Sequence, residues 1–407
     1  MGSMALRLLQ RMIDALALQA GIAFALRLPD GEMLHAGGGP PRFTMVFHTD
    51  GALLAAVMRG HIGLLEAYFD QTLDVEGDLA AAFAAGLAAG VDARPDPIGR
   101  LENGLHEWRF SNHDSAQAQG NARVHYGLPE AFYRLWLDDP LKLYTCAYWP
   151  EGTTTLEQAQ RQKVDHVCRK IRLGPNDLFV DVGCGFGGFM LRAAQTTGAS
   201  GVGINTTPEQ VRWLRGEITR QGLDARLLVR EADFRDVGGP FDKLVSIGVL
   251  EHAGRDQLSE VIHAHAEALA PGGLGLLHFI GHVGRYDTDL FIRKHVFPGG
   301  WIPALSDVIV AMERCGLEIV DIENLRRHYA LTLDEWARRF EAHWPDIRAL
   351  DSTRFDERFR RIWRSYLIGC AEMFRSPAGY THLFQIVFSK GNLAPQGYPM
   401  GRGFLYD

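Results

Sequence analysis

Hydrophobic and polar positions along the chain fall into two regions with different periodicities. In the first region, up to about residue 92, Ala- and Leu-rich stretches predict helices at 5–18, 51–59 and 77–90, and alternating stretches predict strands at 22–28 and 43–47. Beyond about residue 125, apolar runs alternate with stretches of helical period. We therefore expect a smaller N-terminal α+β domain followed by an α/β domain.

Apolar runs in the second region predict the strands of its sheet: 178–182, 201–204, 226–230, 243–248, 273–280, 318–323 and 382–389. Helical patterns lie between them, for example at 208–221 and 256–269. Strands that alternate with helices build a doubly wound sheet. Such a sheet binds its ligands at the carboxyl ends of the strands.

Composition sets the expected domain boundaries. A segment with two prolines, residues 92–99, ends a predicted domain of residues 1–95 and opens a polar linker with partial helix at 96–124. The sheet domain is expected at 125–392, before a C-terminal tail of residues 393–407. A helical region at about 325–379, rich in Trp and Phe, interrupts the sheet domain and is expected to roof a pocket.

One turn carries the most direct chemical signal. The predicted strand Leu178–Val182 contains Asp181 and runs into a turn with four glycines between Gly183 and Gly188. Glycines at such a turn let a nucleoside cofactor approach the main chain and the helix N-terminus. The next strand ends in Asn205-Thr206-Thr207, without the acid that dinucleotide sites place there, so the turn favours S-adenosylmethionine (SAM) over NAD. The alternative is a tight turn with no ligand.

Charge and cysteine usage exclude several classes of protein. A net charge of −7 and a pI of about 6.1 argue against nucleic acid as the main partner. The five cysteines are scattered without a metal-type pair, so we expect no metal site and a cytoplasmic location. We also expect no membrane span, because no apolar stretch is expected to reach the length of one. The basic segment 353–364 suits either a membrane surface or a solvated helix face above an aromatic core stripe.

A series of motifs in a fixed order resembles the cyclopropane fatty acid synthase family and its mycolic-acid-modifying relatives. The series runs from about residue 120 to 390, and a weaker likeness at 66–70 and 75–79 reaches into the first domain. The matching blocks are His125-Tyr126, Phe132-Tyr133, Tyr144–Tyr148, Leu156–Gln160 with Lys163, Asp181–Gly185, Gln210, Asp233–Asp236, Gly248–His252, Leu277–Ile280, Phe297–Gly300, His328–Leu333 with Trp336, and Phe384–Phe388.

The resemblance implies a Rossmann-like SAM methyltransferase domain with a mixed, mostly parallel, seven-stranded sheet. It implies methyl transfer from SAM to the double bond of an unsaturated phospholipid acyl chain. Attack by the alkene leaves a carbocation, so the site must exclude water, stabilise positive charge and remove a proton. Loss of a proton from the new methyl closes a cyclopropane ring, the expected product. Loss of a chain proton gives a methyl-branched or methylene fatty acid, such as a precursor of furan lipids.

Two alternatives belong to other functional classes. A methyltransferase acting on oxygen or nitrogen of a soluble acceptor is compatible with the fold. A catalytically silent lipid-binding protein is the other alternative.

The family positions that hold a bicarbonate ion, thought to be the base, are matched by Cys146, Glu251, His278, Ile280 and Tyr329. Plain structural interpretations exist for several of them. Glu251 suits a helix start, His278 a satisfied core histidine, and Tyr329 simple packing. Cys146 is expected to be a small buried hydrophobe and not a nucleophile.

The resemblance also implies the residues that bind SAM. Asp181 is included, and the methionine part of SAM is assigned to Gly183 and Gly185, with Tyr144 and Thr145 capping it from a loop. The ribose is assigned to Asn205, Thr206 and Gln210, at the end of the second sheet strand. The adenine is assigned to Asp233 and Phe234, at the end of the third.

The chain departs from the family pattern in three places. Gly127 and Glu130 stand where the family has Asp and Asn, His295 where it has Tyr or a similar residue, and Trp301-Ile302 where it favours an acid and Leu. These positions are expected to flank the cofactor lid and the acyl channel, so they bear on the product and on the bicarbonate site.

The remaining expectations concern partners and location. We expect a homodimer, bound peripherally to the inner face of the membrane, where its phospholipid substrate lies. The N-terminal domain is expected to serve membrane docking or dimerisation, because its first helix is amphipathic and the two-proline segment sets it apart.

Overall fold

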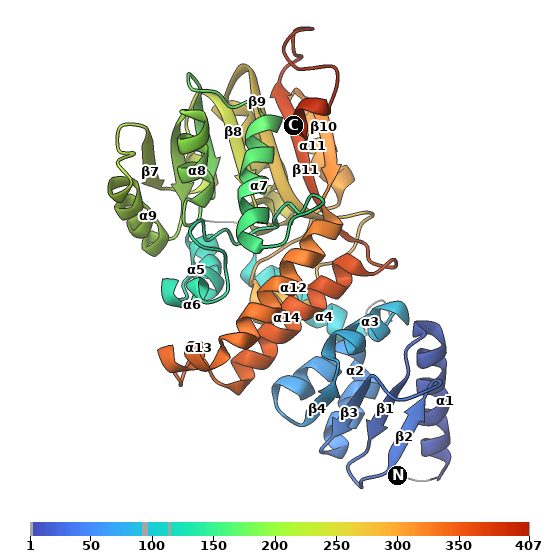
Figure 1. The fold of residues 1–407 in the computed structure, drawn as a ribbon. Coiled ribbons are helices and arrows are strands. Elements are labelled where there is room, and N and C mark those ends of the chain that lie inside the picture. Colours follow the sequence, from blue (N-terminus) through green and yellow to red (C-terminus); the bar gives the residue numbers. More distant parts are fainter. Residues whose placement is uncertain (1–2, 92–96, 113–114, 407) are drawn as a thin grey trace. The chain divides into compact units, whose positions relative to one another are not determined.

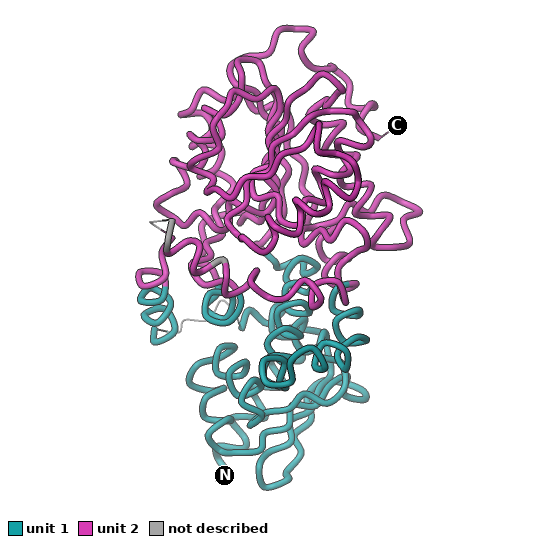
Figure 2. The backbone as a smooth tube through the Cα atoms, turned by 90° about the vertical axis from the view of Figure 1, so that its left-hand side faces the viewer, with its two compact units in different colours: residues 1–106, 289–296, 336–379 teal, residues 107–288, 297–335, 380–407 magenta. Residues whose placement is uncertain are grey.

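The computed structural model describes residues 3–91, 97–112 and 115–406. They form two compact units, drawn in different colours in Figure 2: unit 1 comprises residues 1–106, 289–296 and 336–379, and unit 2 comprises residues 107–288, 297–335 and 380–407. The inserted helices at 336–379 thus group with the N-terminal residues, whereas composition assigned them to the sheet domain. Most of the two-proline boundary lies outside the described residues.

Unit 2 is built on a seven-stranded sheet (Figure 1). Five neighbouring strands run parallel, and β11 is antiparallel to both of its neighbours, which makes the sheet mixed. The strand order is β10-β11-β9-β8-β5-β6-β7, with β5 at Leu178–Val182, β6 at Ser200–Asn205, β7 at Leu227–Glu231, β8 at Phe241–Ile247, β9 at Leu269–His282, β10 at Leu317–Asn324 and β11 at Thr381–Lys390. The predicted fold class and all seven predicted strands are confirmed, with ends shifted by a few residues.

Helices cover both faces of this sheet, because its strands are apolar on both sides. Within β5, Phe179 belongs to one buried cluster and Val180 and Val182 to the other. The first cluster includes residues of α7 (Leu156–Lys170), α8 (Gly188–Thr197) and α9 (Pro208–Arg220), and the second includes residues of α10 (Leu258–Ala268) and α11 (Leu305–Arg314).

The segment expected to be a polar linker is largely helical. It contains α4 (Pro97–Phe110) and α5 (Ser115–Tyr126), and the short α6 (Glu130–Arg134) follows. Polar helices with few buried residues lack the apolar periodicity on which the sequence prediction relied.

Unit 1 contains a four-stranded sheet in the order β2-β1-β3-β4. Its strands are β1 (Phe24–Arg27), β2 (Met33–Ala36), β3 (Phe43–Phe47) and β4 (Leu73–Gly77), and its first helices are α1 (Ser3–Ala20), α2 (Asp50–Phe69) and α3 (Leu79–Ala88). The strands β2 and β4 were not predicted, because each is only four or five residues long and contains polar residues, one in β2 and two in β4.

The helix α2 corrects the expectation that no stretch reaches the length of a membrane span. By length and composition alone, Asp50–Phe69 is long and apolar enough to cross a membrane, and 39% of its 18-residue apolar stretch is buried within the protein. The helix is interrupted at Gly60, where φ is 55° and ψ is −132°. A buried helix of a folded core meets the same criteria, so this finding is weak evidence for a span.

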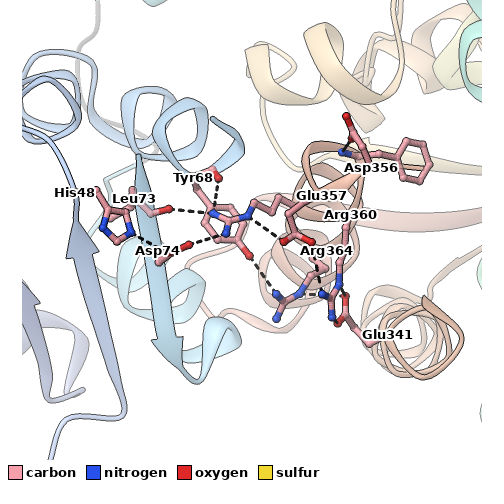
Figure 3. A network of polar contacts seen from close by, with 11 residues as sticks. His48, Tyr68, Leu73, Asp74, Glu341, Asp356, Glu357, Arg360 and Arg364 are labelled. Atoms are coloured by element: carbon pink, nitrogen blue, oxygen red, sulfur yellow. Dashed lines mark hydrogen bonds and ion pairs between the residues drawn. The ribbon is translucent and has the colours of Figure 1, made fainter. Parts of the chain in front are cut away.

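The inserted helices are held in unit 1 by a network of ion pairs (Figure 3). The helices are α12 (Arg326–Ala342), which begins in unit 2, α13 (Trp344–Leu350) and α14 (Glu357–Arg375). Arg361 donates to the carbonyl oxygens of Tyr68 and Leu73 at 2.9 and 3.2 Å and pairs with Asp74 at 2.7 Å. Arg360 and Arg364 both pair with Glu341, at 2.6 and 3.1 Å.

These contacts decide between the two interpretations of the basic segment 353–364. Its arginines at 358, 360, 361 and 364 are engaged by acids of unit 1, and Phe359 stacks on the buried Trp363 with ring centroids 5.4 Å apart. The segment is therefore a helix with an aromatic core stripe and an ion-paired face, rather than a basic patch left for a membrane surface.

Candidate functional site

The glycine turn after β5 has a conformation that other residues cannot adopt. Gly183 has a φ of 75°, and a Cβ there would lie 2.3 Å from Cγ2 of Val249. At Gly187, with a φ of 76°, a Cβ would lie 2.2 Å from Cδ1 of Leu214. The backbone N–H groups of Gly183 and Cys184 both donate to the carbonyl of Ile204, at 2.8 and 3.0 Å. The turn is thereby fixed against the carboxyl end of β6, and its glycines leave room for Val249 and Leu214 to pack against the main chain.

Asn205, at the end of β6, connects the turn to the next helix. Its Nδ2 donates to the carbonyl of Gly185 at 3.0 Å and to Oε1 of Gln210 at 2.9 Å, and its Oδ1 accepts from the N–H of Thr207 at 3.0 Å. Thr206 lies between them and is half-buried. The structure thus brings together Gly185, Asn205 and Gln210, three of the residues expected to surround SAM.

The acid expected at the adenine has a partner within the chain. Asp233 is buried and accepts from the N–H of Arg235 at 3.1 Å and from its Nε at 2.6 Å. The guanidinium of Arg235 also lies over the ring of Phe234, 4.8 Å from its centroid. Ala232, directly before this pair, donates to the carbonyl of Asn205 at 3.1 Å. Asp233 and Phe234 therefore lie at the same edge of the sheet as Asn205.

The loop of Tyr144 and Thr145 is tied down from α7. Gln160 donates to the carbonyls of Leu143 and Thr145 at 3.0 and 2.9 Å, and Lys163 donates from Nζ to Oγ1 of Thr145 at 2.7 Å. Both α7 side chains are fully buried. Cγ2 of Thr145 lies 3.0 Å from where a Cβ of Gly248 would stand, so the loop lies against the carboxyl end of β8.

Tyr144 belongs to an aromatic cluster around the same turn. Its hydroxyl is hydrogen-bonded to Nε2 of His125 at 2.9 Å, and its ring lies 5.8 Å from that of Tyr133. Tyr133 in turn lies 5.7 Å from Phe186 in the glycine turn. The capping loop and the glycine turn are therefore connected by contacts between aromatic rings.

Two charged groups are buried beneath this cofactor region. Burial raises the pKa of Asp181 to about 8, against the opposing influence of the Lys163 ammonium. Burial also lowers the pKa of Lys163 to about 8, although Asp138, Cys146 and Asp181 work in the other direction. Lys163 thus supports Thr145 through a hydrogen bond, and its charge opposes the rise in the pKa of Asp181.

Glu251 and His278 form the second half of the site. Oε1 of Glu251 accepts from the N–H of Ile280 at 2.6 Å. The carbonyl of His278 accepts from the N–H of Gly248 at 2.8 Å, which joins β9 to the turn leading to Glu251. Among the described residues, Oε2 of Glu251 and Nε2 of His278 are buried side-chain atoms without a hydrogen-bond partner. Buried polar atoms of this kind normally have partners, so the pair marks a place for a ligand.

Burial sets the protonation of both groups. It raises the pKa of Glu251 to about 7, and it lowers the pKa of His278 well below its ordinary value, an effect to which Lys163 and Lys170 add. Near neutral pH, the histidine is therefore neutral and the carboxyl group keeps its proton in part. Such groups can offer hydrogen-bond donors to an anion.

The loop of Cys146 is hydrogen-bonded to α12 one turn from Tyr329. The N–H of Ala147 donates to Oγ1 of Thr332 at 3.1 Å, and Thr332 lies one turn beyond the buried Tyr329. The N–H of Leu325 donates to the carbonyl of Leu383 at 2.7 Å, and Leu383 is the register partner of Ile280. The helix thus starts beside the strands that carry Ile280 and His278.

Cys146 is buried, its Sγ donates to the carbonyl of Ala147 at 3.2 Å, and burial raises the pKa of its thiol. A buried thiol that keeps its proton is a poor nucleophile, which agrees with the expected role as a small apolar residue.

The departures from the family pattern have local explanations. A Cβ at Gly127 would lie 2.5 Å from the carbonyl oxygen of Arg123, so the end of α5 requires glycine. Glu130 lies 3.4 Å from Nζ of Lys142. His295 belongs to unit 1 and pairs with Glu66 at 3.0 Å. Trp301 is buried, and its backbone N–H donates to the carbonyl of Glu251 at 2.9 Å, so the main chain at this departure is joined to that of Glu251.

Sequence reasoning missed the supporting residues of the site. Gln160, Lys163, His125 and Gln385 all stand in the matched motifs, but no role was derived for them. Their partners are up to 107 positions away in the chain, as for Gln385 and His278. A polar residue inside an otherwise apolar strand, as at Gln385, was the available signal.

Comparisons with known proteins show which family this chain resembles. A family model described as mycolic acid cyclopropane synthetase matches residues 113–386. A probable fatty acid methyltransferase of Pseudomonas putida is 35% identical over 90% of this chain and 91% of its own length. The cyclopropane-fatty-acyl-phospholipid synthase of Escherichia coli K12 is 32% identical over 82% of this chain and 85% of its own. The structure of mycolic acid cyclopropane synthase CmaA1 complexed with SAH and CTAB matches with a TM-score of 0.62 and 30% identity, over 69% of this chain and all of that one.

Proposed function

The chain belongs to the mycolic acid cyclopropane synthetase family of SAM-dependent methyltransferases, and we propose that it converts the double bond of an unsaturated phospholipid acyl chain into a cyclopropane ring. The observation that carries this proposal is the buried pair of unpartnered atoms, Oε2 of Glu251 and Nε2 of His278. A methyltransferase for soluble amines or hydroxyls needs no anion site of this kind, because its acceptor already has a lone pair.

The residues around the glycine turn fit SAM. Side-chain-free main chain at Gly183 and Gly185 lies beside Asn205 and Gln210, which offer polar atoms near the end of β6. When bound there, SAM supplies an electrophilic methyl group. The protein's contribution is to hold the acyl chain against that group and to exclude water from the cation that forms.

Aromatic rings are suited to the positive charge that develops on the acyl chain. Phe297 lies 4.0 Å from the ring of His125 and 5.6 Å from that of His252, and Tyr126 is hydrogen-bonded to Nε2 of His252 at 2.8 Å. The faces of such rings carry negative charge and attract cations. We propose that this cluster flanks the reacting carbon atoms.

We propose that Glu251 and His278 hold the base, a bicarbonate ion, together with Ile280, Tyr329 and the Cys146 loop. The fit rests on the two unpartnered buried atoms and on the protonation that burial imposes, since both side chains can donate to an anion. Bound bicarbonate supplies a weak base, which suffices because a carbocation is a strong acid. The side chains themselves position it and shield it from water.

The proposal is tested by mass spectrometry of lipids from cells that express the protein and are fed trideuteromethyl methionine. Retention of two deuteriums in a ring product shows that the proton left the new methyl group, as proposed. Retention of all three shows that the acyl chain lost the proton and that the product is methyl-branched. Label absent from lipid but present in a soluble acceptor would overturn the proposal.

We also propose that unit 1 carries the surface that meets the lipid layer. Leu54, Val57 and Met58 are exposed on one side of α2, and Ile98, Leu101 and Leu105 on one side of α4. An ion pair between Arg59 and Glu102 joins the two helices, and we propose that these six side chains form one apolar patch. A patch of this kind favours a lipid surface in a protein whose substrate is an acyl chain.

A further inference from the structure

His278 has a hydrogen-bond partner on the neighbouring strand. Gln385 of β11 is the register partner of His278 in β9, and its Nε2 lies 3.1 Å from Nδ1 of the imidazole. Gln385 is fully buried and His278 is 1% exposed. The other ring nitrogen, Nε2, is the unpartnered atom of the site. One side of the ring is therefore held by the sheet, and the other is free for a ligand.

A neutral imidazole carries a single ring proton, and its place depends on what Nδ1 meets. If the Gln385 amide nitrogen donates to Nδ1, the proton is on Nε2 and the site gains a donor. If the amide were turned, its oxygen would accept from Nδ1–H, and the buried NH₂ would be left without a partner. Buried N–H groups without partners are rarer than carbonyl oxygens without partners, so the first arrangement is favoured. In this arrangement Oε1 of Gln385 is the amide atom that lacks a partner among the described residues.

We infer that Gln385 is a positioning residue that fixes the tautomer of His278, so that Nε2–H is presented to the site as a donor. This inference rests on the proposed function for the anion that receives the hydrogen bond, but the tautomer itself does not depend on the reaction. A second strand pair provides a matched control. Thr381 and His282 are also register partners in β11 and β9, and Oγ1 of Thr381 lies 3.3 Å from Nδ1 of His282.

The experiment records long-range ¹⁵N–¹H correlation spectra of the full chain with labelled histidine, and the His278 signals are assigned by their loss in His278→Asn. The wild type is expected to show the Nε2–H tautomer. Gln385→Met and Gln385→Leu, two variants in case one fails to fold, are expected to shift the Nδ1 resonance. They are expected to lower kcat roughly 10- to 100-fold, as is usual for lost partners of site ligands, with KM for SAM little changed. Thr381→Val is expected to leave the His278 signals and kcat unchanged.

An Nδ1–H tautomer in the wild type would overturn the inference. So would Gln385→Met and Gln385→Leu proteins with wild-type His278 signals and wild-type kcat. Failure of the proposed function has a different signature, because methyl transfer to a soluble acceptor would leave the tautomer as inferred. The two ideas therefore fail separately.

Discussion

Two clusters in unit 2 each bury a glutamate and a histidine, but they differ in whether the glutamate has charged partners. In one, Glu323 accepts from Nζ of Lys170 at 2.6 Å and is hydrogen-bonded to Nε2 of His166 at 2.8 Å. In the other, Glu251 has one oxygen on the N–H of Ile280 and one without a partner, and Nε2 of His278 also has none among the described residues. Both clusters contain a glutamate and a histidine in the interior of the unit.

The two glutamates show how pairing changes the effect of burial on the pKa of a carboxyl group. For Glu323, burial works to raise the pKa, but the His166 hydrogen bond and the Lys170 charge bring that pKa to about 2. For Glu251, burial prevails and the pKa rises to about 7. Pairing turns a buried acid into a contribution to stability, whereas an unpaired acid is a cost that only a ligand offsets. Disruption of the first cluster should thus affect folding, and disruption of the second should affect turnover.

The largest effect is expected for Glu251→Ala. Loss of a group that positions the base should lower kcat about 10³-fold, by analogy with the loss of one donor from an anion-binding site. Steady-state assays on vesicles of unsaturated phospholipid measure it, with SAM affinity by calorimetry as the control for an intact cofactor region. A variant that keeps more than about a tenth of the wild-type kcat would show that Glu251 has no part in the chemistry.

A slightly smaller effect, on stability, is expected for Glu323→Gln. The change leaves the buried Lys170 without a carboxylate and should cost about 3 kcal/mol of unfolding free energy. Because the pKa of Glu323 is lowered from 4.5 to about 2 on folding, this contribution is present above pH 4.5 and is lost as the pH falls towards 2. Urea titrations at pH 7 and pH 3 measure both quantities. If Glu323→Gln instead abolishes turnover without loss of stability, the contrast between the clusters is wrong.

The fold of unit 2 was accessible from sequence because its signals are local. Apolar runs such as Leu178–Val182 predict strands by themselves, and the glycine turn that follows identifies the cofactor edge. Unit 1 was less accessible. Its strand β4 is short and partly charged, and the helices at 336–379 are held to it by ion pairs between residues almost 300 positions apart, such as Arg361 and Asp74. No local pattern reveals contacts of that kind.

The candidate site likewise contains residues that the sequence could supply and residues whose role only the structure shows. The resemblance supplied Glu251 and His278, and the structure adds that one atom of each is buried without a partner. The roles of Lys163 under Thr145 and of Gln385 beside His278 depend on three-dimensional proximity, so composition and spacing could not supply them. The assignment of individual residues to SAM and bicarbonate stays a prediction.

A third prediction uses the pKa of Glu251. Its pKa is raised from 4.5 in the unfolded chain to about 7 in the fold, so the carboxyl group contributes stability below pH 4.5 that is lost as the pH rises through 7. Glu251→Gln removes this dependence. We expect the variant to gain about 2 kcal/mol of unfolding free energy relative to wild type between pH 5 and pH 8. Parallel urea titrations measure the difference, and an equal stability difference at both pH values would contradict the unpaired state of the group.

The smallest effect concerns the apolar patch of α2 and α4, which contrasts with both buried clusters because it is exposed. Leu101 is 66% exposed, and its loss from a lipid interface should cost about 1 kcal/mol, or roughly a five-fold weaker partition onto vesicles. Leu101→Ser is compared in co-sedimentation with Leu228→Ser, which alters another half-exposed leucine on the edge strand β7. If the two variants partition equally onto vesicles, the patch does not bind the lipid surface. If Leu101→Ser instead converts a dimer into monomers in analytical ultracentrifugation, the patch covers a second copy of the chain, because an exposed apolar surface of this kind must meet either a lipid or a protein.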